Sequence, residues 1–390
     1  MKLTHILKVF RDESALDLIE YAIVALLIAL VGVVALEMGV SSKPTSSNGK
    51  PPKLVNELAN YETVQVFYAT DRNHLQPLNS IEQYGRDRSD NGSLALGVSS
   101  VSVPRDHLMG NLERPSIWHL DFQENPEKHI VLLSAQQVSY QDFYRGLSGS
   151  LEKTRQKRVL VFVPGFAVTF EDALRRTAQI SYDLNYDGVP VVFSWPSKGK
   201  VNPLDYSADE ASAEWSALHL NFFLEDLVLK SGAKSVDLIA HSMGNRVLSR
   251  SLQQIAGTKS ASAKFNEVIL TAPDIDRGVF LQLAEAMGAV SRRVTVYTSQ
   301  NDKALQASMK LHAYPRAGEQ ADLIVGSGLD SIDASRVATD FIDHSYFANN
   351  QSVISDMYYL LRGTVVDQRF GIRKVPTGKG SYYYRFMPQS

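Results

Sequence analysis

The clearest chemical signature in the chain is a five-residue stretch, Ala240-His-Ser-Met-Gly244. It ends an apolar run that begins at Val236, and it precedes a segment with apolar residues at helical spacing. A serine between small residues at a sharp strand-to-helix turn is typical of the nucleophile elbow, G-x-S-x-G, here with Ala240 in place of the first glycine. We therefore expect Ser242 to be a nucleophile and the Met243 backbone N–H to stabilise an oxyanion. The competing interpretation is an ordinary turn in which the serine only caps the helix.

A serine hydroxyl is a weak nucleophile until a neighbouring base removes its proton. In this kind of site the partners follow the serine in the order acid, then histidine. Two histidines follow Ser242. His312 lies in a segment of helical pattern that starts near Lys303, which favours a structural or solvated role. His344 lies in a loop before the last predicted helix, and we predict that it is the base.

The acid of such a site should follow a strand at its carboxyl end. Asp302 ends the stretch Tyr297-Thr-Ser-Gln-Asn-Asp302, directly after a predicted strand, and is the first candidate. It would fix the imidazole tautomer and stabilise the imidazolium. Asp274 and Asp276 follow the preceding predicted strand and are the alternatives. Their competing role is to cap a helix or to hold the turn.

A second oxyanion donor is expected from the loop after the first central strand. That loop is Pro164-Gly-Phe-Ala167, in which Gly165 would let the backbone approach a substrate closely. We predict that the Phe166 N–H is this donor. Trp195, at the end of another predicted strand, and His241 are candidates to line the substrate pocket, although large aromatic side chains are as often part of a core.

The elements that must position these residues alternate between strands and helices. We predict strands at 63–69, 94–103, 129–134, 159–163, 189–194, 236–240, 267–271 and 293–297, and helices at 141–154, 171–184, 209–230, 279–287, from about 303, and at 348–361. Residues 79–91 are predicted as a surface loop, and residues 198–208 as a surface loop or part of a lid. This alternation predicts an α/β fold with a mainly parallel central sheet, helices on both faces and ligands at the carboxyl ends of the strands.

The composition excludes several kinds of chemistry. The 390-residue chain contains no cysteine, which rules out disulfides, zinc–thiolate sites, iron–sulfur clusters and a cysteine nucleophile. Its net charge of −2 gives no electrostatic reason to expect a nucleic-acid partner. The chain has neither a His-Glu-x-x-His motif nor a P-loop, and no metal or organic cofactor is implied.

The first 40 residues differ from the rest of the chain. Basic residues precede an uncharged apolar run, Tyr21–Leu36, which as a helix would span roughly 24 Å, a little less than a bilayer core. We expect a transmembrane helix in the inner membrane, with its basic N-terminus in the cytoplasm and the following domain in the periplasm. One alternative is a signal peptide, cleaved after the small residues Val33 and Ala35, which would release a secreted protein. A buried core helix is the other alternative.

Residues 41–60 are rich in proline and serine and are predicted to form a flexible linker. They separate the membrane helix at 1–40 from a single α/β domain that we expect at 61–364. Residues 365–390 are expected to be a C-terminal tail that docks on the domain surface or on a partner.

The stretch Phe10-Arg-Asp-Glu-Ser-Ala-Leu-Asp-Leu-Ile-Glu20-Tyr21 precedes the apolar run. Together, residues 10–40 resemble the N-terminus of a Flp-type pilin. The resemblance implies an inner-membrane helix with the rest of the chain outside the cytoplasm. Such pilins are cut after a glycine by a prepilin peptidase, and Ala15 stands at that position here.

A series of ordered motifs covers about residues 62–362. They are Phe67-Tyr-Ala-Thr-Asp-Arg72, Val101–Pro104, Val161-Phe-Val-Pro-Gly-Phe166, Phe193-Ser-Trp-Pro-Ser197, Ile239-Ala-His-Ser-Met-Gly-Asn245, Ala272-Pro-Asp-Ile-Asp276, Asn301-Asp-Lys-Ala-Leu305, Ile332-Asp-Ala-Ser335 and His344-Ser-Tyr-Phe347. In these motifs the chain resembles a bacterial family of esterase- or lipase-like α/β-hydrolases whose function is not established. The resemblance implies an α/β-hydrolase fold and a triad of Ser242, Asp302 and His344.

Members of that family usually carry His-Gly-Phe-Asn where this chain has Pro164-Gly-Phe-Ala167. The histidine and the asparagine are therefore lost, while the glycine and Phe166 are kept. We expect this change to alter how the loop is held and to leave the Phe166 N–H in place.

These features predict a serine hydrolase that cleaves a carboxylic ester, with a small or lipid-like acyl ester as substrate and membrane contact through the N-terminal helix. The rival hypothesis is a catalytically weak or inactive hydrolase fold, tethered to the membrane as an interaction partner of a pilus or secretion apparatus. A complete triad favours the enzyme, because a scaffold gains nothing from keeping these three side chains together.

Overall fold

The structure is a computed structural model. It describes residues 59–75, 83–115, 123–258, 264–319, 328–337, 350–377 and 380–387. The predicted membrane helix, nearly all of the predicted linker, and His344 lie outside these ranges. Among the helices within them, none has both the length and the apolar character needed to cross a bilayer.

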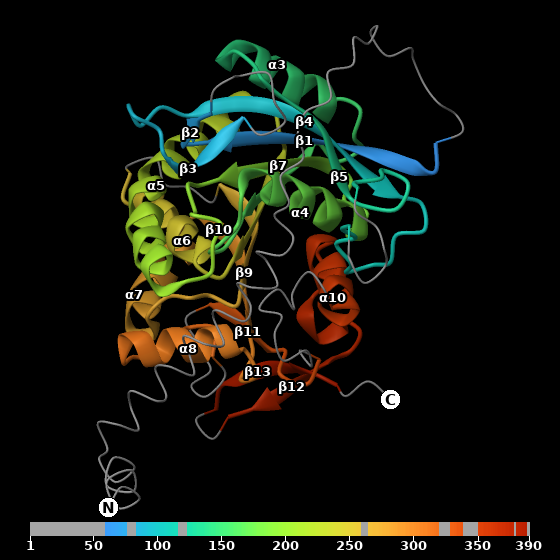
Figure 1. The fold of residues 1–390 in the computed structure, drawn as a ribbon. Coiled ribbons are helices and arrows are strands. Elements are labelled where there is room, and N and C mark those ends of the chain that lie inside the picture. Colours follow the sequence, from blue (N-terminus) through green and yellow to red (C-terminus); the bar gives the residue numbers. More distant parts are fainter. Residues whose placement is uncertain are drawn as a thin grey trace, which may run out of the picture.

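One large sheet organises the domain (Figure 1). Its strand order is β12-β13-β11-β10-β9-β8-β6-β7-β1-β4-β5, and β2 and β3 form a separate two-stranded ribbon. The strands are β1 (Tyr61–Thr70), β2 (Arg72–His74), β3 (Tyr84–Arg88), β4 (Ala95–Pro104), β5 (Val131–Gln137), β6 (Arg158–Val163), β7 (Gly188–Ser194), β8 (Ser235–His241), β9 (Phe265–Thr271), β10 (Ser291–Thr298), β11 (Leu329–Asp333), β12 (Ile372–Pro376) and β13 (Tyr382–Phe386).

The centre of the sheet is parallel. All neighbouring pairs from β1 and β7 through β6, β8, β9, β10 and β11 to β13 are parallel. The antiparallel pairs lie at the two ends of the sheet: β1 with β4, β4 with β5, and β12 with β13. Parallel strands are usually covered on both faces and read as continuous apolar runs. The six residues of β6 fit this rule, because all of them are buried. Because these strands are parallel, their carboxyl ends lie at one common edge of the sheet.

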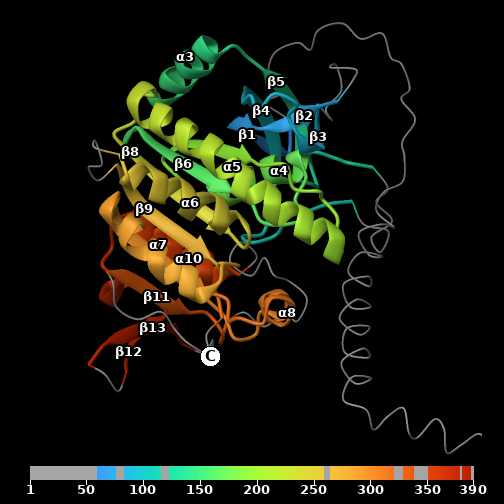
Figure 2. The same ribbon diagram turned by 90° about the vertical axis from the view of Figure 1, so that its left-hand side faces the viewer.

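Helices cover both faces of the sheet (Figures 1 and 2). One apolar cluster joins alternate residues of β6, such as Val161, to α3, α5, α6 and α7, and the other joins the intervening residues, such as Phe162, to α4 and α10. The helices are α3 (Tyr140–Leu151), α4 (Phe170–Asp183), α5 (Pro203–Lys230), α6 (Gly244–Ala256), α7 (Arg277–Ala289), α8 (Lys303–His312) and α10 (Gln351–Leu361), with a short 3₁₀ turn at Val366–Gln368.

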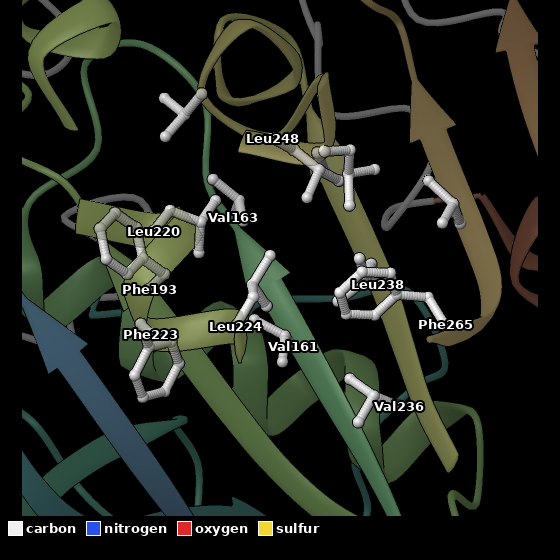
Figure 3. Close-up of a cluster of buried hydrophobic side chains, with 14 of the residues drawn as sticks. Val161, Val163, Phe193, Leu220, Phe223, Leu224, Val236, Leu238, Leu248 and Phe265 are labelled. Carbon is white, nitrogen blue, oxygen red and sulfur yellow. The ribbon is translucent and has the colours of Figure 1, made fainter. Parts of the chain in front are cut away.

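Figure 3 shows part of the first cluster, where Val161 and Val163 of β6 and Leu238 of β8 face side chains of α5 and α6. Leu224 of α5 and Leu248 of α6 have no exposed surface. Burying a leucine side chain stabilises a fold by about 1.5–3 kcal/mol. The strand, elbow and helix that carry Ser242 are therefore built into a rigid core.

The predicted strands and helices are confirmed within the described ranges, with boundary shifts of a few residues. Helix α5 differs most, because it begins at Pro203 with Asn202 as its N-cap, six residues before the predicted start. Two apolar side chains of this helix, Leu218 and Phe222, are 46% and 57% exposed.

Two predicted loops were wrong. Within 79–91, Tyr84–Arg88 forms β3, which pairs with β2. The stretch 198–208 includes the first six residues of α5, so only residues 198–202 can belong to a loop. The segment expected as a C-terminal tail contributes β12 and β13, and β13 pairs in parallel with β11.

Candidate active site

Ser242 occupies a sharp turn between β8 and α6. Its φ is +51°, in the left-handed region, where a residue with a Cβ atom is strained by roughly 1–2 kcal/mol. The turn is fixed from β9, because the Ser242 N–H donates to the Thr271 carbonyl at 3.0 Å. Asn245 closes the turn from the other side, since its side-chain amide donates to the carbonyls of Ser242 and Thr271 at 2.9 and 3.0 Å. Strain held by surrounding structure is common where a side chain must be presented for chemistry.

Two glycines let this turn pack against the loop after β6. A Cβ atom on Gly244 would lie 2.3 Å from the Pro164 carbonyl oxygen, and one on Gly165 would lie 2.9 Å from the Ser242 Cβ. Contacts this short leave no room for a Cβ atom unless the neighbouring backbone shifts. The predicted nucleophile and the predicted oxyanion loop are therefore in contact at the carboxyl edge of the sheet.

The loop after β6 is held along its length. The Trp195 indole N–H donates to the Pro164 carbonyl at 2.7 Å, and Ala167 adopts a left-handed φ of +58°. The Phe166 ring packs edge-on against Tyr206 of α5, with ring centroids 5.2 Å apart. Among the backbone–backbone hydrogen bonds of turns and loops in the described ranges, none is donated by the N–H of Phe166 or of Met243.

The two residues predicted to line the substrate pocket have different surroundings. Trp195 has no exposed surface and belongs to the core cluster, so it supports the loop and does not face a pocket. Its fixed indole N–H explains why a large aromatic side chain stands at this position. His241 is 8% exposed and directly precedes the nucleophile. Its Nδ1 packs against Gly165, where an added Cβ atom would lie only 3.0 Å away from it.

Asp274 lies next to the elbow, but other groups occupy its carboxylate. Its backbone N–H donates to the Ser242 carbonyl at 3.2 Å. Its carboxylate accepts from Tyr206 at 2.5 Å, from Ser308 at 2.6 Å and from Arg316 at 2.8 Å. Burial alone would raise the pKa of Asp274, but Arg246 and Arg316 outweigh it and hold the pKa at about 2. This carboxylate is a structural anion, fixed in place by cations.

Asp302 and Asp276 both cap helices. Asp302 follows β10 and accepts from the Leu305 N–H at 3.0 Å, at the start of α8. Asp276 accepts from the Val279 N–H at 2.9 Å, at the start of α7. Asp302 is 5% exposed and lies at the same edge of the sheet as the elbow, because β10 is parallel to β9 and β8.

His312 has partners for both ring nitrogens. Its Nδ1 lies 2.7 Å from the Ser308 carbonyl, and its Nε2 lies 2.8 Å from Glu210 of α5. This arrangement fits the structural role that the sequence suggested. The other downstream histidine, His344, lies outside the described residues.

Sequence reasoning missed the polar residues on the first turns of α5. Tyr206, Asp209 and Glu210 are spaced i, i+3 and i+4, which places them on one face of the helix. Asp209 is fully buried and accepts from the Ser197 hydroxyl at 2.5 Å and from the Lys198 N–H at 2.9 Å. Burial raises the pKa of Asp209 to about 6, although these hydrogen bonds oppose the rise. Only the spacing of acidic and aromatic residues could have pointed to this face.

The mainly parallel sheet, the strand-to-helix elbow and the adjoining glycine loop define an α/β-hydrolase. A family model agrees, because residues 140–363 match the family described as alpha/beta hydrolase of unknown function (DUF900). The match covers more than half of the chain, and the protein belongs to this family. The curated proteins include no match to the chain.

Proposed function

We propose that the protein is a serine hydrolase that cleaves carboxylic esters through an acyl-enzyme. The supporting observation is the position of Ser242, in a left-handed turn pressed against Gly165, with Gly244 at the start of the following helix. An ordinary helix cap needs neither the strained φ nor the contact between two loops. A nucleophile elbow needs both, because its hydroxyl must stand clear of the sheet beside the oxyanion donors.

In this reaction Ser242 Oγ attacks the acyl carbonyl carbon while His344 takes the hydroxyl proton. The backbone N–H groups of Phe166 and Met243 bind the oxyanion, and Asp302 orients the imidazole. The ester C–O bond then breaks as His344 returns the proton to the leaving alcohol. A water molecule, deprotonated by His344, attacks the acyl-enzyme and releases the acid.

The test is turnover of p-nitrophenyl esters of increasing acyl length by the full-length protein, with the Ser242→Ala variant alongside. The expected result is ester cleavage that the substitution abolishes, and labelling of the parent by a fluorophosphonate. The chain-length profile would then give the size of the acyl pocket. Equal turnover by parent and variant, or no turnover and no labelling, would contradict the proposal, and the second outcome would favour the membrane-tethered scaffold.

We further propose that residues 1–40 anchor the protein in the inner membrane, that residues 41–60 are a linker and that the hydrolase domain is periplasmic. The basis is the uncharged run Tyr21–Leu36 after a basic start. Cell fractionation tests the anchor, and the intact mass of the purified protein would reveal cleavage after Ala15 or Ala35. Full-length protein in the soluble cytosolic fraction would overturn this location.

A further inference from the structure

Two buried charged residues hold the loop that follows β6. Arg72 binds it directly, and Asp209 binds it through the Ser197 hydroxyl. Arg72 is 1% exposed, and its guanidinium donates to the carbonyls of Val168 at 2.8 Å and Ser197 at 3.0 Å. Asp209 is fully buried and accepts from the Ser197 hydroxyl at 2.5 Å and from the Lys198 N–H at 2.9 Å. Arg72 therefore binds both the loop after β6 and the segment after β7, and Asp209 binds the second of these segments.

The Ser197 hydroxyl links the two segments directly. It donates to Asp209 at 2.5 Å and accepts from the Val168 N–H at 3.3 Å. Arg72 also donates to the Ser194 hydroxyl at 2.9 Å and to the Gly85 carbonyl at 3.1 Å, which attaches the assembly to β7 and β3. Hydrogen bonds to charged groups are stronger than those between neutral groups, so the geometry of this loop is firmly set.

The loop is held next to its strained residue, because Val168 directly follows Ala167. Ala167 has a left-handed φ of +58°, a conformation that glycine or asparagine adopts far more readily than alanine. Nothing in an alanine side chain favours this conformation. Ala167 lies between the predicted oxyanion donor Phe166 and Val168, and both backbone groups of Val168 are held. Its N–H donates to the Ser197 hydroxyl, which itself donates to Asp209, and its carbonyl accepts from Arg72.

We propose that Asp209, acting through Ser197 and together with Arg72, is a positioning residue that fixes the backbone of Val168, thereby holds Ala167 in the left-handed conformation, and so aims the Phe166 N–H at the oxyanion. This inference rests on the proposed function. Asp209 acts through the backbone and does not contact the reacting atoms. Loss of its charge should therefore affect the transition state more than substrate binding.

The test compares kcat and KM of the full-length protein with those of Asp209→Asn, using p-nitrophenyl butyrate. Removal of one oxyanion donor lowers kcat by about 10²–10³-fold in well-studied hydrolases, and a misaimed donor should cost roughly 10- to 100-fold. We expect this loss in kcat, a KM within about threefold of the parent, and a parallel fall in the rate of fluorophosphonate labelling.

A second substitution separates positioning from general damage to the fold. In Asp209→Asn combined with Ala167→Gly, glycine keeps the left-handed conformation without help from Asp209, and we expect at least part of the kcat to return. The matched control is Asp356→Asn, which alters another buried, ion-paired aspartate, on α10 and away from the loop. It should lower the unfolding midpoint and leave kcat within about threefold of the parent.

The outcomes distinguish the two proposals. A parent without Ser242-dependent turnover or labelling would overturn the proposed function and this inference together. An active parent whose Asp209→Asn variant keeps its kcat would overturn only the inference. The same holds if the kcat loss is not relieved by Ala167→Gly, or if Asp356→Asn lowers kcat as much as Asp209→Asn does.

Discussion

A Cβ atom on Gly244 would lie 2.3 Å from the carbonyl oxygen of Pro164, so the start of α6 touches the loop after β6 backbone to backbone. This contact brings together two segments that are separated by almost eighty residues of sequence. It also explains why the residue two positions after the serine must be glycine, whereas Ala240, two positions before it, can have a side chain.

Gly244→Ala should therefore damage the site. The added methyl group must push the two loops apart, which should lower kcat by about 100-fold or more and destabilise the fold by roughly 1–3 kcal/mol. The measurements are ester turnover and urea unfolding. Gly149→Ala is the control, because a Cβ atom there meets nothing within 4 Å and alanine favours the surrounding helix α3 by about 1 kcal/mol. A fully active Gly244→Ala variant would show that the contact is unimportant.

The three acid candidates can be separated by replacing each with asparagine. Asparagine caps a helix as well as aspartate does, so Asp302→Asn should keep the start of α8 intact while it removes the negative charge. We expect a fall in kcat of about 10³–10⁴-fold with little change in the unfolding midpoint. Asp276→Asn makes the same chemical change at the cap of α7 and should retain activity.

Asp274→Asn should show a different pattern, because Arg246 and Arg316 would lose their buried counter-charge. Removing one partner of a buried ion pair costs about 3–5 kcal/mol, so the main effect should be on stability. The opposite ranking, with Asp302→Asn active and Asp274→Asn folded but inactive, would reassign the acid to Asp274.

Arg369, just after the 3₁₀ turn, should be essential to the stability of the domain. It is 3% exposed and pairs with Asp356 of α10 at 3.2 Å, and Asp356 also accepts from Tyr297 of β10 at 2.6 Å. Arg369→Met should lower the free energy of unfolding by about 3–5 kcal/mol, because it strands the Asp356 carboxylate. The exposed Arg373 is the control, and Arg373→Met should change the free energy of unfolding by less than about 0.5 kcal/mol. Equal effects would mean that the C-terminal segment is only loosely attached.

Stability should fall in mildly alkaline solution because of His107. Burial alone would lower the pKa of His107, but hydrogen bonds to Asp183 and Glu113, at 2.8 and 2.9 Å, outweigh it and raise the pKa to about 9. The unfolded chain titrates near 6.5, so the folded state binds more protons between these values. The contribution is fully present below about pH 6.5 and is lost as the pH rises through 9.

Urea unfolding of the parent and of His107→Gln at pH 6 and pH 9.5 measures this contribution. The parent should lose up to about 3 kcal/mol more than the variant between the two values. His74→Gln, at an exposed position, should follow the parent. A parent and a His107→Gln variant with the same pH dependence would show that the charged histidine does not stabilise the fold.

The centre of the fold was predictable because its signals are local. Strand β6 is an uninterrupted apolar run from Val159 to Val163, β8 contains the apolar run Leu238-Ile-Ala240, and the elbow follows from small residues around Ser242. Strand β11 was not predicted, because Asp330 and Ser331 interrupt its apolar pattern and only its neighbours in the sheet make it a strand. Strands β12 and β13 were not predicted either. They are half exposed, and charged side chains interrupt their apolar patterns as well.

The candidate site was predictable only in part, for a related reason. The types and order of the residues indicated Ser242, Asp302 and the loop at Phe166. The sequence could not show that Trp195 is a buried support, nor that Asp209 is linked through Ser197 to the loop at Val168, because these contacts join separate segments of the chain.

The place of β1 in the sheet decides how the domain would bear mechanical load. Any tension transmitted by the chain before residue 59 enters the fold at Tyr61, the first residue of β1. This strand lies inside the sheet, paired antiparallel with β4 over ten residues and parallel with β7 from Phe67 to Thr70. A pull along the strand loads these hydrogen bonds in shear, all at once, whereas a strand peeled from an edge would lose them one by one. The domain should therefore resist unfolding by a pull on its N-terminal end better than it would if β1 were an edge strand.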